Sequence, residues 1–249
     1  MRVGRSVTDG RVRSPGGSRN STGSATRTTR SARPFPTTTD TTVQRQARGR
    51  LRMEQILDAA DAVTRRRGVA GASLQDVAQE AGLPPASLYH YFPTSQALLL
   101  QLAQRYLAAF ETLAARPLDH DGITAWSDLC AFHADLALRF YGEHPVAMRL
   151  LLGPECGWEI RAADHAANRR IGGIYYRKLI QHFIVAESTV LEEAFAVSVT
   201  ISDAVWALSF ARSGAIEPAM AREALRARLA YLGLYVGIHV EKRSAPLLV

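Results

Sequence analysis

The chain has 249 residues, which suits one or two domains with a real hydrophobic core, and its hydrophobic share of 47% is in the globular range. No apolar run reaches the ~18 residues of a membrane span and no secretory signal is visible, so we expect a cytoplasmic protein without a membrane partner. The net charge of +7 is uneven, because residues 1–52 carry 12 Arg and 2 Asp whereas the remainder has more acids than bases. This distribution indicates a basic tail rather than a basic globular body.

Residues 1–46 are predicted to be a disordered basic tail. They are rich in Ser, Thr, Gly, Pro and Arg and have too few large apolar residues to offset the entropy of ordering. Just beyond them, Arg48 and Arg50 are candidates for an arm that follows DNA phosphates or enters the minor groove, as homeodomain arms do. The alternative is a solvated tail with no role. A first helix is expected from about Arg48 to Arg67, whose basic end is favourable against the C-terminal dipole.

A helix-turn-helix is predicted next. Apolar residues recur at i, i+3, i+4 and i+7 from Leu74 to Ala81, which is one face of a short helix. Ser73 can cap the start of this helix, and Gly82 can end it because glycine adopts positive φ at no steric cost. Pro85 can open a second helix, since a proline in the first turn gives up only an N–H that would be unpaired anyway. Two short helices joined by a glycine turn form a helix-turn-helix.

The second helix of this pair leaves one face open. Its outward residues are Pro85, Ala86, Ser87, Tyr89, His90 and Tyr91. Small residues followed by aromatic residues with polar tips suit a helix that enters a major groove by its N-terminus. The alternative is an ordinary corner between two helices.

Four motifs lie between residues 52 and 100: ILDAA at 56–60, GV at 68–69, SLQDVA at 73–78 and LYHYF at 88–92. With these motifs the segment resembles the N-terminal domain of TetR-family transcriptional regulators. The resemblance implies an all-α homodimer with an N-terminal three-helix helix-turn-helix domain and a C-terminal helical domain for ligand binding and dimerisation. The expected domains are a tail at 1–46, a DNA-binding domain at 47–94 and an effector-binding and dimerisation domain at 95–243.

The resemblance also implies roles for single residues at the DNA. Phosphate contacts fall to Ser73, Tyr91 and Thr94, and contacts to bases or backbone fall to Pro85, Ala86, Ser87, Tyr89 and His90. Two positions depart from the family's pattern, because Pro84 stands where a capping serine is frequent and Gln96 where a lysine is usual. We therefore expect one phosphate contact to be weaker or to come from another residue.

The remaining sequence predicts further helices and no strands. Their expected ranges are 95–116, 124–141, 146–152, 161–185, 189–213 and 217–240. A single recognition helix reads too few base pairs for useful specificity, so we expect a homodimer on a near-palindromic operator. The last two helices are predicted to form its interface as a four-helix bundle, since 189–213 is apolar nearly all round. The alternative is that 189–213 is simply internal core.

An effector pocket is expected among the helices at 95–116, 124–141, 161–185 and 189–213. Its candidate residues are Phe110, Trp126, Cys130, His133, Tyr176, Trp206 and Phe210. Aromatic walls with a few polar tips suit an apolar cavity, although aromatic residues at helical spacing also form plain core.

No cofactor, metal site or enzymatic activity is predicted. The histidines lack paired ligand spacing, and two cysteines, Cys130 and Cys156, are too few for a zinc site or a disulfide framework. No nucleophile elbow, phosphate-binding glycine loop or metal-protease motif occurs. The favoured function is a ligand-responsive repressor that binds DNA. The alternative is a helical small-molecule carrier or enzyme with an incidental helix-turn-helix, and the sequence does not choose between repressor and activator.

Overall fold

The computed structural model describes residues 38–155, 157–237 and 239–247. In these residues the protein is helical, with nine helices and one isolated antiparallel bridge between Phe183 and Lys242, which confirms the all-α fold class. Residues from Gln44 onward form one compact unit. The predicted tail and Cys156 lie outside the described residues, except for the part of the tail from Thr38 onward.

The first helix is longer than the sequence predicted. α1 spans Thr38–Arg67, so the last part of the expected disordered tail is helical. Gln44 to Arg48 are good helix formers, and once a helix is nucleated each further residue adds a backbone hydrogen bond at low cost. The prediction of disorder up to residue 46 is therefore wrong for the described residues.

Two short helices follow α1 and form the helix-turn-helix. α2 spans Leu74–Glu80 and α3 spans Pro85–Tyr91. Gly82 has φ 63°, its N–H donates to the carbonyl of Gln79, and the N–H of the next residue donates to the carbonyl of Ala78 at 2.9 Å. These two bonds make a Schellman motif, which needs a residue with positive φ at this place. The predicted glycine turn is confirmed.

A small apolar core unites these three helices. The N-terminal core side chains buried to 1% exposure or less are Ile56, Ala60, Val63, Val77, Ala78 and Leu88. One bond from a side chain to the backbone reinforces the core: Gln55 Nε2 donates to the carbonyl of Ala81 at 2.8 Å. The core fixes the angle between α2 and α3 and so determines which face of α3 points outward.

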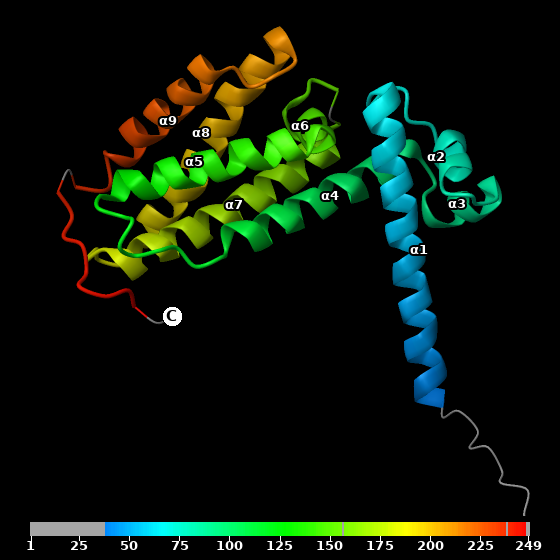
Figure 1. Ribbon diagram of the computed structural model, residues 1–249, viewed down its shortest axis with the longest axis horizontal. Helices are drawn as coiled ribbons and strands as arrows, with labels where there is room; N and C mark the ends of the chain where they lie inside the picture. Colours follow the sequence, from blue (N-terminus) through cyan, green and yellow to red (C-terminus); the bar gives the residue numbers. More distant parts are fainter. Residues whose placement is uncertain (1–37, 156, 238, 248–249) are drawn as a thin grey trace, which may run out of the picture. The chain divides into compact units, whose positions relative to one another are not determined.

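A helical bundle follows, and α4 runs into it from the helix-turn-helix (Figure 1). Its helices are α4 Ser95–Ala114, α5 Trp126–Glu143, α6 Pro145–Leu152, α7 Trp158–His182, α8 Thr189–Ser213 and α9 Pro218–Leu232. Two bounds differ from expectation. α7 begins at Trp158 rather than near residue 161, because Gly157 occupies the N-cap and Glu159 lies in the first turn, where an acid is favourable. α9 ends at Leu232 rather than near residue 240.

The chain after α9 turns back along the end of α7. The N–H of Ile184 donates to the carbonyl of Glu241 at 2.8 Å, and the N–H of Arg243 donates to the carbonyl of His182 at 2.9 Å. The side chain of His182 also lies 2.8 Å, Nδ1 to Nδ1, from His120 in the loop before α5. These bonds take the last described residues out of any continued helix, and a periodicity argument does not foresee them.

α8 is the central helix of the bundle. It packs against α7 and α9, and a Cβ at Gly172 of α7 would lie 2.4 Å from the Cα of Ala196, so the two backbones are in contact there. By length and composition α8 is apolar enough to cross a membrane, but half of its apolar window is buried in the protein. It also buries Ser198, Ser202 and Asp203. α8 is therefore a core helix of the bundle, with part of its surface left outside.

Candidate nucleic-acid interface and ligand cavity

α3 presents the predicted open face to solvent. Leu88 is fully buried and Phe92, at the C-cap, is 5% exposed, and these two side chains anchor the helix. Tyr89 is 54% exposed and Tyr91 38%. The other predicted residues of this face, all exposed, are Pro85, Ala86, Ser87 and His90. A short helix held by its inner residues and bare on its outer face can enter a major groove.

A surface groove runs between α3 and α1. Its lining includes Arg52 from α1 and Ala86, Ser87, His90 and Tyr91 from α3. Arg52 therefore lies beside α3, and its Nη1 donates to Gln55 Oε1 on α1 at 3.2 Å. In this place it can contact a phosphate of a duplex that α3 enters, which would fix the register of the base-reading residues.

The two predicted arm residues lie on different sides of α1. Arg48 and Arg50 are both exposed and both helical. Arg48 precedes Arg52 by four residues and so lies one turn away on the same face, whereas Arg50 is two residues from each and points elsewhere. The structure thus brings Arg48, but not Arg50, to the face of α1 that borders the groove.

Ser73 and Thr94 are helix caps, and their hydroxyls are partly occupied. Ser73 Oγ accepts from the N–H of Asp76 at 3.1 Å and donates to Asp76 Oδ2 at 2.6 Å. Thr94 Oγ1 accepts from the N–H of Ala97 at 3.1 Å. The Thr94 hydroxyl proton remains for a phosphate, whereas the Ser73 proton is given to Asp76, so of the two Thr94 is the better donor.

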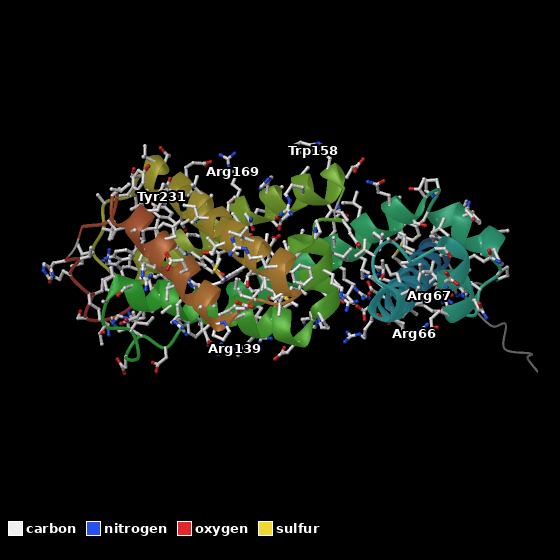
Figure 2. All side chains as sticks on the ribbon, turned by 90° about the horizontal axis from the view of Figure 1, so that it is seen from above. Arg66, Arg67, Arg139, Trp158, Arg169 and Tyr231 are labelled. Carbon is white, nitrogen blue, oxygen red and sulfur yellow. The ribbon has the colours of Figure 1, made fainter. Side chains whose placement is uncertain are left out.

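Two ion pairs hold α2 against α1, and the sequence interpretation missed both of them. Arg66 and Arg67, at the end of α1 (Figure 2), pair with α2 through Glu80 at 2.6 Å and Asp76 at 2.7 Å. The hydrogen bond from Arg66 lowers the pKa of Glu80. The basic end of α1 therefore holds α2 as well as facing the helix dipole. The acids on the exposed side of α2 could have predicted these ion pairs from the sequence.

Gln96, at the position where the resembled family usually has lysine, is bonded to the bundle. Its Nε2 donates to Glu159 Oε2 at 2.9 Å, which ties the first turn of α4 to the first turn of α7. The neighbouring Trp158 projects into solvent and is 76% exposed (Figure 2). Gln96 thus makes an internal contact, which accounts for the departure from a basic residue.

A cavity lies inside the bundle, bordered by the four helices expected and also by α6 and α9. It measures ≈ 40 Å³, on a scale where about 10–15 Å³ holds one water molecule. Its aromatic walls are Phe110, Phe140, Tyr141, Tyr175 and Trp206. Its polar and charged lining residues include His133, Asp164, Asn168, Ser202, Asp203 and Arg228. An apolar chamber with a few polar groups is the usual form of a small-molecule site.

The predicted effector residues divide into two groups. Phe110, His133 and Trp206 line the cavity. Trp126, Cys130, Tyr176 and Phe210 do not line this cavity, so their predicted part in effector binding stays a prediction that the cavity does not support. Each has another place. Trp126 is the first residue of α5, Cys130 is fully buried, and Phe210 borders a separate surface groove beside the end of α1.

Tyr176 shows why the pattern misleads. Its hydroxyl accepts from the N–H of Ser188 at 2.7 Å and holds the loop before α8. The preceding residue, Tyr175, lines the cavity instead. Neighbours on a helix differ by about 100° in direction, so a one-residue error of phase exchanges a cavity wall for a loop contact.

The two acids of the cavity are held in different ways. Asn168 Nδ2 donates to Asp203 Oδ2 at 2.7 Å, and Arg161 Nη1 donates to Asp164 Oδ2 at 2.9 Å. Burial, and then the charge of Asp164, raise the pKa of Asp203 to about 8. Burial also raises the pKa of Asp164. At neutral pH Asp203 is therefore mostly protonated, while Asp164 has an arginine beside it.

The two basic side chains of the cavity, His133 and Arg228, also differ in charge. Burial, and then the charge of Arg228, hold the pKa of His133 well below its usual value, so His133 is neutral. Its ring stacks on Tyr175 with centroids 3.5 Å apart. The guanidinium of Arg228 lies 5.1 Å from the centroid of the same tyrosine ring. Arg228 thus brings a full positive charge into the cavity.

Two helices connect this cavity with α1. On α4, Arg105 pairs with Asp58 of α1 at 2.7 Å, Tyr106 donates to Asp61 of α1, and the following Leu107 lines the cavity. On α6, Arg149 Nη1 donates to the carbonyl of Arg65 at 3.3 Å, and α6 also supplies a cavity residue. A change in either helix at the cavity therefore acts directly on the helix that holds α2 and α3.

This combination defines a class of protein: a helix-turn-helix unit with an exposed recognition helix, joined to a helical domain with an internal cavity. Residues 56–102 match the family model described as bacterial regulatory proteins, tetR family. The HTH-type transcriptional regulator EthR of Mycobacterium tuberculosis is 36% identical over 75 residues, which cover 28% of this chain. The match spans 35% of the length of that relative.

Solved structures extend the likeness over the bundle. A TetR-family transcriptional regulator from Streptomyces coelicolor has a TM-score of 0.55 at 24% identity, covering 74% of this chain and 99% of the other. The Thermus thermophilus repressor FadR, in complex with lauroyl-CoA, has a TM-score of 0.52 at 21% identity, covering 79% of this chain and 100% of the other. Residues 56–102 therefore resemble the helix-turn-helix domain of tetR-family regulatory proteins, and the solved structures share the helical fold of the bundle.

Proposed function

We propose that the protein is a sequence-specific DNA-binding transcriptional regulator of the cytoplasm that acts as a homodimer on a near-palindromic operator. The observation that carries the proposal is the exposed outer face of α3, supported from beneath by Leu88 and Phe92. Residues 47–94 would read DNA. Ala86 and Ser87 at the start of α3 would approach base edges, and Arg52, Arg48 and Thr94 would contact phosphates.

The dimer surface is proposed to lie on α8 and α9. Val190, Val197 and Leu208 are exposed on α8 and, at spacings of 7 and 11 residues, share one side of the helix. An apolar stripe outside a core helix is costly in water and supports burial against a second copy. The equivalent stripe of the partner would complete a four-helix bundle and set the spacing of the two recognition helices.

Residues 95–243 are proposed to bind a small-molecule effector in the bundle cavity. A ligand that prefers one arrangement of the cavity would shift α4 through Tyr106 and Asp61, or α6 through Arg149 and Arg65. The two reading heads of a dimer must keep a fixed separation, so a small change in either contact lowers operator affinity. This mechanism makes the protein a ligand-released repressor.

Selection of bound fragments from genomic DNA tests the function. The purified chain should enrich short near-palindromic sequences, and Ser87→Asp and Tyr89→Ala should weaken binding to the selected operator by about tenfold or more, since the first places a charge against the duplex and the second removes a contact. Arg139→Ala, on an exposed part of α5, is the control and should bind as the unaltered chain does. A monomer with no preference over random duplex at moderate ionic strength would contradict the proposal.

A further inference from the structure

The guanidinium of Arg228 is buried in the cavity with part of its hydrogen-bonding capacity unused. The residue lies on α9, lines the cavity and is 3% exposed. Among the described residues, neither Nε nor Nη2 of Arg228 has a hydrogen-bond partner. Leaving charged donors buried and unpaired is expensive, so a group that accepts from both nitrogens would be held strongly.

A second arginine, Arg170, shows what the edge formed by Nε and Nη2 of a guanidinium can bind. Arg170 of α7 donates from Nε to Glu111 Oε2 at 2.9 Å and from Nη2 to Glu111 Oε1 at 2.6 Å. These two parallel bonds are the side-on fork by which a guanidinium holds a carboxylate. Arg228 presents the same pair of nitrogens inside the cavity, where water is scarce and a charge-assisted pair is stronger than at the surface.

Further unpaired polar atoms border the same space. In the described part of the chain, Nε1 of Trp206 and both ring nitrogens of His133 are buried without partners, and both side chains line the cavity. The indole is a donor, and a neutral imidazole offers one donor and one acceptor. Together with Arg228 they provide an excess of donors, which suits a ligand whose polar end accepts hydrogen bonds.

The acids of the cavity do not oppose an anion. Asp164 is paired with Arg161 at 2.9 Å, and Asp203 is bonded to Asn168. Burial and the neighbouring Asp164 hold Asp203 largely in its protonated form at neutral pH, which leaves the charge of Arg228 in excess. The rest of the wall is aromatic, and the space of ≈ 40 Å³ admits only a small ligand without rearrangement.

We propose that the cavity takes a small organic carboxylate with an apolar body, whose two oxygens accept from Nε and Nη2 of Arg228 while Trp206 and His133 bond its polar end. The aromatic walls surround the apolar part. The proposal names the class of ligand that the effector site takes. It rests on the proposed function only where it implies that the ligand changes DNA binding. Carboxylate binding itself follows from the cavity alone.

The test compares acids with neutral analogues of the same shape on the full chain. Acetate and propionate should bind at pH 7, measured by calorimetry and by quenching of tryptophan fluorescence, and acetamide and propionamide should bind at least about tenfold more weakly, since an amide cannot form the charged fork. Arg228→Met should remove this preference. Arg170→Met, which loses the same fork at the surface, is the matched control and should retain it.

Several results would overturn the assignment: acids and amides bind equally, no acid binds, or Arg228→Met keeps the preference. If Arg228→Met does not fold, Arg228→Lys keeps the charge without the fork and must still reduce the preference. Operator binding of the same preparations separates the two proposals. Intact operator binding without any carboxylate binding sinks the ligand assignment alone, whereas carboxylate binding without operator binding sinks the proposed regulation alone.

Discussion

The helix-turn-helix and the bundle use their polar side chains differently. In the first, Ser73 caps α2, and Arg66 and Arg67 each pair with an acid of α2. In the second, among the described residues, Arg228 and Trp206 keep buried donors without partners. The helix-turn-helix pairs these charged groups, although Thr64 Oγ1 of α1 is buried without a hydrogen-bond partner among the described residues. The cavity that we propose as the effector site keeps these donors unsatisfied, which costs stability.

The largest expected effect lies in the bundle, at the crossing of α7 and α8. In Gly172→Ala the new Cβ would lie 2.4 Å from the backbone of Ala196, so one helix must move. We expect a loss of about 1–3 kcal/mol or more in the free energy of unfolding, measured by urea denaturation. Gly142→Ala on α5 is the control, because its Cβ meets nothing within 4 Å, and we expect little loss or a gain of about 0.5–1 kcal/mol there.

The corresponding glycine of the helix-turn-helix should have a smaller effect on stability and a larger one on DNA. Gly82 has φ +63° and open space around its Cα, so Gly82→Ala is strained by backbone conformation alone, at about 1–2 kcal/mol. Because the turn sets the angle of α3, operator affinity should fall more than for Gly172→Ala at equal folded fraction. Gly49→Ala, in open space within α1, is the control. A larger loss of operator affinity for Gly172→Ala than for Gly82→Ala would contradict the comparison between the helix-turn-helix and the bundle.

The third expected effect depends on pH: it is absent near pH 4, and it sharpens the account of the charges in the cavity. The pKa of Asp203 is raised to about 8 from an ordinary 3.8, so the folded state holds a proton that the unfolded state releases, and stability is lost as pH rises from about 4 to about 8. Asp203→Asn removes this loss and can still accept from Asn168. The gain in Tm should be near zero at pH 4 and should grow steadily as the pH rises to about 8.

Asp135→Asn is the control for this measurement, because Asp135 is an exposed acid of α5. Its Tm should follow the unaltered chain at every pH. A gain for Asp203→Asn that does not change between pH 4 and pH 8 would show that Asp203 is ionised throughout, and the balance of charge around Arg228 would need revision.

The parts that the sequence predicted well depend on neighbours in the chain. Ser73, Gly82 and Pro85 act within a turn of their own position, so the limits of α2 and α3 follow from local rules. The open face of α3 follows equally, because Leu88 and Phe92 are the apolar residues of a short segment and the others must face outward.

The parts that it missed depend on contacts between distant segments. Tyr176 was predicted to line the cavity and Tyr175 does so, since the phase of α7 is set by its close approach to α8. Arg228 was not predicted, because a basic residue on an amphipathic helix ordinarily faces water. The early end of α9 depends on backbone bonds from Arg243 to His182, which no local pattern encodes.

The narrow anchoring of α3 has an evolutionary consequence. Leu88 and Phe92 carry its attachment to the fold, while Ala86, Ser87 and Tyr89 contribute little to the core. Substitutions at these outer positions are nearly free of folding cost. Descendants of this chain can therefore exchange one target promoter for another in a few steps, while the scaffold beneath stays constant.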